Sequence, residues 1–173
     1  MTPCVFFDRD GIVNESPGPG YVRRWADFRL IPEFVEVLGR VASKGYLAVI
    51  VTNQRGVSRG TMTLGEVEDI HACLRRLLKE SHGLELTDVM CCPHEEGQCD
   101  CRKPRPGMLL QAAKKHLIDL GRSWMVGDSE TDIEAGRRAG CRTIRVGGDT
   151  ASTSADHHVP DMAGLLSLVE KLL

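Results

Sequence analysis

Short apolar runs alternate along the chain with longer stretches whose apolar residues recur every three to four positions. The short runs predict buried strands, and the amphipathic stretches predict helices that turn one face to a core. The expected strands cover residues 5–7, 46–51, 86–91, 124–126 and 142–146. The expected helices cover residues 32–45, 63–81, 106–120, 129–140 and 161–173.

Two of the expected helices start with a recognisable capping signal. Thr63 and Glu66 predict a capping box ahead of the second helix, and Ser129 and Asp132 predict another. Strand and helix alternate about five times, so we predict an α/β fold of Rossmann-like type, with a parallel sheet covered by helices on both faces.

Polar residues collect where the predicted strands end. Asp8, Thr52, a Cys/His-rich segment at 91–102 and Asp128 each follow a strand. In open parallel sheets, ligands bind beyond the carboxyl ends of the strands. We therefore expect these four segments to form one site.

Length, composition and charge narrow the classes of function. One domain spanning residues 1–173 fits this length. The net charge of −2 provides no basic field, so we expect neither nucleic acid nor a membrane surface as partner. No apolar run approaches the roughly 20 residues of a membrane-spanning helix, and the N-terminus does not resemble a signal peptide. A cytoplasmic protein is expected.

The motif Asp8-Arg9-Asp10-Gly11 places two carboxylates one residue apart at the end of a buried strand. Such crowding is costly without a cation. One carboxylate can attack phosphorus to form an acyl-phosphate, and the other can protonate the leaving oxygen and later activate water. Taken alone, the motif is about equally compatible with a solvated acidic turn.

Three further segments favour phosphate chemistry. Thr52 offers a hydroxyl to phosphate oxygens, and Lys103 offers a cation for phosphoryl charge. Asp128 adds a carboxylate, an oxygen ligand that suits Mg²⁺. Each residue alone could be a turn, a surface charge or a helix cap, but together, in order and at strand ends, they predict a catalytic site.

These motifs resemble the haloacid dehalogenase superfamily over roughly residues 5–146. The resemblance implies that Asp8 is the nucleophile and Asp10 the general acid/base, with Thr52 and Lys103 steadying the phosphoryl group. It also implies a catalytic Mg²⁺ held by Asp8, the backbone carbonyl of Asp10, and Asp128. Asp132 is expected to support the site without binding the metal.

A second cluster contains three cysteines and a histidine, which form a complete tetrahedral zinc set. Its members are Cys92, His94, Cys99 and Cys101. Four protein ligands leave no open position, so this Zn²⁺ would be structural and would fix the loop that delivers Lys103. A metal-free reduced loop is the alternative. Cys91 is expected to point into the core, and Cys4, Cys73 and Cys141 are expected to be buried.

The spacing around the zinc set, with Arg102-Lys103-Pro104 directly after it, resembles a zinc-bearing branch of the superfamily without a large cap domain. This branch contains phosphatases of heptose bisphosphate and of histidinol phosphate. The resemblance favours the C7 phosphate of D-glycero-D-manno-heptose 1,7-bisphosphate as substrate, with histidinol phosphate or another small phosphorylated metabolite as alternatives. The alternative from a different functional class is a binding protein without catalytic activity whose loop is held by zinc.

The heptose-type resemblance also implies substrate contacts and a flap at about residues 14–21. The implied substrate-binding residues are Gly20, Tyr21, Asn53, Gln54, Arg55 and Arg102. The chain departs from the pattern in the extra Pro and Gly residues of the flap and in Ser129, where a lysine is common. A monomer is expected, since nothing in the sequence demands a partner.

Overall fold

The computed structural model describes residues 1–149 and 152–173 and contains one six-stranded sheet. The strands are β1 Cys4–Phe7, β2 Leu47–Asn53, β3 Asp88–Cys92, β4 Trp124–Gly127, β5 Arg142–Val146 and β6 His157–Val159. The helices are α1 Pro32–Ser43, α2 Leu64–His82, α3 Gly107–His116, α4 Glu130–Ala139 and α5 Met162–Leu172, with short 3-10 turns η1 Trp25–Asp27 and η2 Leu120–Arg122.

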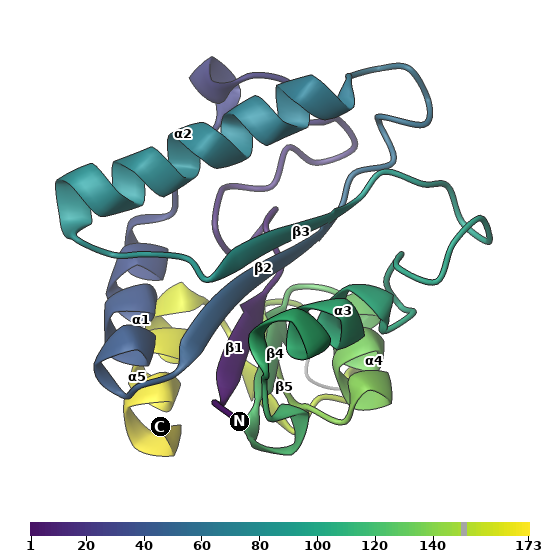
Figure 1. Ribbon diagram of the computed structural model, residues 1–173. Coiled ribbons are helices and arrows are strands. Elements are labelled where there is room, and N and C mark those ends of the chain that lie inside the picture. The colour runs from purple at the N-terminus through teal and green to yellow at the C-terminus, as the bar shows by residue number, and fades with distance from the viewer. Residues whose placement is uncertain (150–151) are drawn as a thin grey trace.

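Every strand pair is parallel, in the order β3-β2-β1-β4-β5-β6, and helices cover both faces, which confirms the predicted Rossmann-like α/β fold (Figure 1). Alternate strand residues face opposite ways. Val5 and Phe7 pack with α1, α2 and α5, whereas Cys4 and Phe6 pack with α3 and α4.

Local sequence signals place several helix ends as predicted. The capping boxes at Thr63 and Ser129 are both present, and Gly83 and Gly140 end α2 and α4 in the left-handed conformation. The helix expected over 106–120 is shorter, because Leu117 adopts a positive φ of 53° and ends α3 at His116.

The sequence prediction missed β6. His157–Val159 is only three residues long and carries two histidines, so it has no periodic pattern of apolar residues. It nevertheless pairs with β5 along the sheet edge. Two cysteine predictions were also wrong: Cys91 and Cys73 are half-buried, while Cys4 and Cys141 are buried as expected. β3 begins and ends later than predicted, so the fully buried cysteine at its end is Cys92.

The strand order sets the position of the site. Central β1 lies between β2 and β4, and chain connections leave β1 and β4 in opposite directions along the sheet. This is the switch point at which α/β sheets open a crevice beyond their strand ends. In the described part of the chain, no helix combines the length and hydropathy required to cross a bilayer.

Candidate active site and metal centres

Three carboxylates converge at the switch point. Asp8 follows β1, Asp128 follows β4, and Asp132 lies in the first turn of α4. One carboxylate oxygen from each lies within 4.8 Å of the others. Residues 120 or more positions apart in the sequence meet here because β1 and β4 are hydrogen-bonded neighbours whose carboxyl ends share one edge.

Lys103 is the cation inside this cluster. Its Nζ donates to Asp8 Oδ1 at 2.6 Å and to the Val51 carbonyl at 2.8 Å, and it pairs with Asp132 Oδ1 at 2.6 Å. An ammonium has three donors, so all of them are used. Asp132 Oδ2 in turn accepts from the hydroxyl of Ser129 at 2.6 Å. Asp132 is therefore held by protein groups on both oxygens.

One lysine does not neutralise three carboxylates, and the pKa values reflect this. Burial, followed by the charge of Asp132, raises the pKa of Asp8 to about 7, although Lys103 opposes the rise. Burial and Asp132 also raise the pKa of Asp128 to about 6. Burial lowers the pKa of Lys103, but Asp132 and Asp8 outweigh it and hold that pKa above its usual value. The surplus negative charge is what a divalent cation would offset.

Two glycines allow this crowding. A Cβ on Gly11 would lie 2.1 Å from Asp128 Oδ2, and the residue has a positive φ of 93°. A Cβ on Gly127 would lie 2.3 Å from the Cβ of Asp132. Any larger residue at either position would push a carboxylate out of the cluster.

Asp10 lies apart from the three clustered carboxylates, in a cradle of side-chain donors. Its Oδ1 accepts from Arg9 Nη2 at 3.0 Å and from Asn14 Nδ2 at 2.9 Å. Its Oδ2 accepts from Gln54 Nε2 at 3.0 Å. The cradle fixes the direction of the carboxylate while a quarter of the side chain stays exposed.

The end of β2 connects the segments that carry Asp10 and Lys103. The buried hydroxyl of Thr52 accepts from Gln54 Nε2 at 2.9 Å, so one amide contacts both Thr52 and Asp10. The Asn53 amide pairs reciprocally with the backbone of Lys103, at 3.0 and 3.1 Å. The predicted substrate contacts of Asn53 and Gln54 stay predictions, since in the structure both amides serve neighbouring protein groups.

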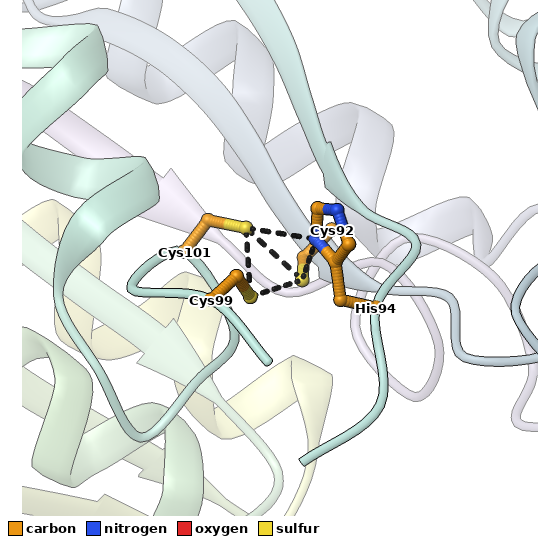
Figure 2. A group of neighbouring side chains, drawn as sticks. All are labelled: Cys92, His94, Cys99 and Cys101. Carbon is orange, nitrogen blue, oxygen red and sulfur yellow. Dashed lines mark hydrogen bonds between the residues drawn. The ribbon is translucent and has the colours of Figure 1, made fainter. Parts of the chain in front are cut away.

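The four predicted zinc ligands converge on one point (Figure 2). The Sγ–Sγ distances are 3.5 Å for Cys92–Cys99 and 3.2 Å for the two pairs made by Cys101. His94 Nδ1 lies 3.6 and 3.5 Å from the sulfurs of Cys92 and Cys101. Two thiolates about 2.3 Å from a shared tetrahedral zinc are about 3.8 Å apart. The sulfurs lie somewhat closer together than this, and the donor set of three thiols and one imidazole around a common point suits such an ion.

The cysteine cluster is connected to the edge of the sheet where the carboxylates gather. Arg102 Nη1 donates to the His94 carbonyl at 3.2 Å, and Lys103 follows two residues after Cys101. On the other side, the backbone N–H of Gln54 donates to the Cys92 carbonyl at 2.7 Å. A fixed cluster thus restrains both segments that contact Asp8 and Asp10.

The remaining predicted substrate residues surround this edge. Gly20 and Arg55 are exposed, and the Tyr21 ring packs on Gly56, where an added Cβ would lie 3.2 Å from the ring carbons. Arg102 lines a cavity of about 290 Å³ that reaches Lys103. Their contacts with substrate remain predictions.

Sequence reasoning missed three residues of the Asp10 environment: Arg9, Asn14 and His71. Arg9 is fully buried and donates through Nη1 to His71 Nε2 at 3.2 Å. The one available signal was an arginine between two carboxylates directly after a strand predicted to be buried. Nothing in the sequence pairs His71, on α2, with that segment.

Comparisons with known proteins agree with this geometry. Residues 100–166 match a family model described as HAD-hydrolase-like. A D-glycero-beta-D-manno-heptose-1,7-bisphosphate 7-phosphatase from Pseudomonas aeruginosa is 38% identical over 143 residues, 82% of this chain and 79% of the relative. An enzyme of the same name from Helicobacter pylori (strain J99) is 41% identical over 137 residues, 79% of this chain and 78% of the relative.

Among solved structures, the D,D-heptose 1,7-bisphosphate phosphatase from B. bronchiseptica, complexed with magnesium and phosphate, superposes with a TM-score of 0.86. Its sequence is 27% identical, and the match covers 100% of both chains. Fold and relatives together define a phosphoric monoester hydrolase of the HAD type. The chain belongs to the HAD-like phosphatase family that includes the heptose-1,7-bisphosphate 7-phosphatases.

Proposed function

We propose that this protein is a Mg²⁺-dependent phosphatase that removes the C7 phosphate of D-glycero-D-manno-heptose 1,7-bisphosphate through an aspartyl-phosphate on Asp8. The observation that carries the reaction type is the convergence of Asp8, Asp128, Asp132 and Lys103 at the switch point. The names of relatives at 38% and 41% identity support the choice of sugar.

In the first step, a carboxylate oxygen of Asp8 attacks the phosphorus and the bond from phosphorus to the sugar oxygen breaks. The carboxyl proton of Asp10 passes to that oxygen, which leaves as an alcohol. The cradle of Arg9, Asn14 and Gln54 directs the Asp10 group. Lys103 and Thr52 stand where charge develops on the phosphoryl oxygens.

In the second step, the carboxylate of Asp10 takes a proton from water, and the water oxygen attacks the phosphorus of the acyl-phosphate. The bond between phosphorus and Asp8 breaks, which regenerates the carboxylate and releases inorganic phosphate. Asp10 ends protonated, ready for the next turnover. Splitting the reaction lets one carboxylate serve as acid and then as base.

Asp8, Asp128 and the backbone carbonyl of Asp10 would hold the Mg²⁺. The surplus charge of the cluster and the raised pKa values of Asp8 and Asp128 support a divalent cation there. When bound, the ion neutralises charge that would otherwise keep an anionic substrate away from an anionic nucleophile. Asp132 is already bonded to Lys103 and Ser129 and supports the site from outside the metal's ligand set.

The cysteine cluster would hold a structural Zn²⁺, since four protein ligands leave no position for a substrate. All seven cysteines are free thiols, which is compatible with this role and with the proposed cytoplasmic location. The carboxylate and Cys/His sets are each complete within one chain, so we propose that the enzyme acts as a monomer.

A substrate panel tests the proposal. Both anomers of the heptose bisphosphate, histidinol phosphate and other small phosphate esters would be assayed for phosphate release with Mg²⁺. The highest kcat/KM is expected for heptose bisphosphate. A higher value for histidinol phosphate would overturn the substrate, and no turnover of any ester would favour a non-catalytic binding protein.

A further inference from the structure

Arg9 is a buried charge that the reaction as described does not use directly. Its side chain has no exposed surface, and it lies between the nucleophile Asp8 and the acid/base Asp10 in the chain. A buried guanidinium is costly unless its donors are satisfied. Two of its nitrogens, Nε at 3.2 Å and Nη2 at 3.0 Å, donate to the same oxygen of Asp10.

The third nitrogen of Arg9 donates to His71 on α2. Because Nη1 can only donate, His71 Nε2 must be the acceptor, so the imidazole is neutral with its proton on Nδ1. Burial, followed by the charge of Arg9, lowers the pKa of His71 to about 3. His71 is therefore a permanent hydrogen-bond acceptor for Arg9 at any pH at which the enzyme would be used.

The position of His71 is rigid. Its neighbours Ile70 and Leu74 on α2 are fully buried in the core, and the helix starts at a capping box. A side chain held by a packed helix restrains its partner more precisely than a loop does. The contacts run from α2 through His71 and Arg9 to the oxygen of Asp10.

We propose that Arg9 and His71 are positioning residues for Asp10: His71 fixes the guanidinium, and the guanidinium fixes the direction of the acid/base carboxylate. The inference rests on the proposed phosphatase function and deepens it. Without His71, one donor of Arg9 is left unpaired in the interior and the guanidinium is free to turn, so Asp10 no longer aims reliably at the leaving oxygen.

The test uses two substrates of similar size that differ in their need for an acid. The oxygen leaving p-nitrophenyl phosphate is a good leaving group without a proton, whereas that of benzyl phosphate requires protonation. A misplaced acid lowers kcat/KM selectively for benzyl phosphate. A general loosening of the fold lowers both values equally.

Four variants carry the test. His71→Leu removes the acceptor, whereas His71→Gln keeps an acceptor oxygen at similar reach. Arg9→Lys keeps the buried charge but cannot hold Asp10 and His71 together. Leu165→Ala, at a fully buried position on α5, weakens the core from a helix that does not carry His71 and serves as the control. Circular dichroism and thermal melting establish that each variant folds.

His71→Leu and Arg9→Lys are expected to lower kcat/KM for benzyl phosphate by about 10-fold or more. General acid–base catalysis accelerates a reaction by roughly 10²–10⁴-fold, and a misdirected acid loses part of that acceleration. The same variants should change kcat/KM for p-nitrophenyl phosphate less than about 3-fold, and His71→Gln should restore most of the benzyl value. Should His71→Leu fail to fold, Arg9→Lys gives the same selectivity readout.

Equal losses for both substrates in His71→Leu and Arg9→Lys, or a selective loss in Leu165→Ala, would overturn the positioning role. So would full activity of His71→Leu toward benzyl phosphate. Failure of the wild-type protein to hydrolyse these two esters and heptose bisphosphate would instead refute the phosphatase function itself, so the two failures are distinguishable.

Discussion

At the scale of single residues, Asp8 is held in surroundings that oppose its charge, so its ionised form destabilises the fold when no cation is bound. Its folded pKa of about 7 lies above the usual 3.8, mainly because it is buried and lies beside Asp132. Asp8→Asn should abolish turnover and, at pH 8 without metal, raise the melting temperature, by roughly 2–4 °C for each kcal/mol of relieved repulsion. Calorimetry and a phosphate-release assay measure the two effects.

The control for Asp8→Asn is Glu36→Gln, which removes an exposed carboxylate on α1. It should change neither activity nor melting temperature by a measurable amount. A lower melting temperature for Asp8→Asn at pH 8 would contradict the crowded-carboxylate interpretation, and residual turnover at the wild-type rate would rule out the covalent route.

Gly11 and Gly45 form a matched pair that tests the space beside Asp128. Both have positive φ, but only at Gly11 would a Cβ meet the Asp128 carboxylate. Gly45→Ala should lose about 1 kcal/mol of stability and keep its activity. Gly11→Ala should also lower kcat/KM by about 100-fold, because a shift of about 1 Å in a reacting group has that effect. Denaturant melts and kinetics would separate the two; equal activities would disprove the steric argument.

At the scale of elements, the segment between β3 and α3 is restrained by the cysteine cluster rather than by a helix or sheet. We expect about one equivalent of zinc per chain, measured by elemental analysis. Removal of the metal by a chelator, or Cys99→Ser, should raise the hydrogen exchange of residues 102–103 and lower kcat, since Lys103 is delivered by this segment. Re-addition of zinc should restore the chelated enzyme.

Cys73→Ser is the matched control, because Cys73 lies on α2 outside the cluster. It should bind zinc and turn over substrate like the wild type. A zinc-free protein with full kcat and unchanged exchange at residues 102–103 would show that the cluster has no part in positioning Lys103.

At the scale of the whole molecule, stability should depend on Mg²⁺ and pH together. The pKa values of Asp8 and Asp128 are raised in the folded state, to about 7 and about 6. The folded protein therefore favours the neutral form of both groups. Their contribution to stability is fully present below about pH 4 and is lost as the pH rises through 6–7. Mg²⁺ offsets the charge that then appears. The melting temperature should therefore rise more on addition of Mg²⁺ at pH 8 than at pH 5.

Differential scanning calorimetry at both pH values, with and without Mg²⁺, tests this coupling. Asp128→Asn removes one of the two titrating groups and should reduce the difference between the two pH values. A gain of the same size at pH 5 and pH 8 in the wild type would show that Mg²⁺ does not bind at the carboxylate cluster.

The sequence predicted those features of the protein that depend on interactions between residues close together in the chain. The capping boxes at Thr63 and Ser129 lie within four residues, so local chemistry specified them. The proposed zinc ligands Cys92 and Cys101 lie nine residues apart, and their residue types identified the cluster. β6 escaped prediction because its three residues have no pattern of their own and form a strand only by pairing with β5.

The sequence by itself determined the α/β alternation, the strand ends at which polar residues gather and the residue types of both proposed metal clusters, because these follow from hydrophobic period and short-range spacing. Only the tertiary structure decided that Lys103 bridges Asp8 and Asp132, and that Arg9 links Asp10 to His71. Those contacts join residues brought together by sheet order and helix packing, and no pattern in the chain pairs a buried donor with one particular acceptor many residues away.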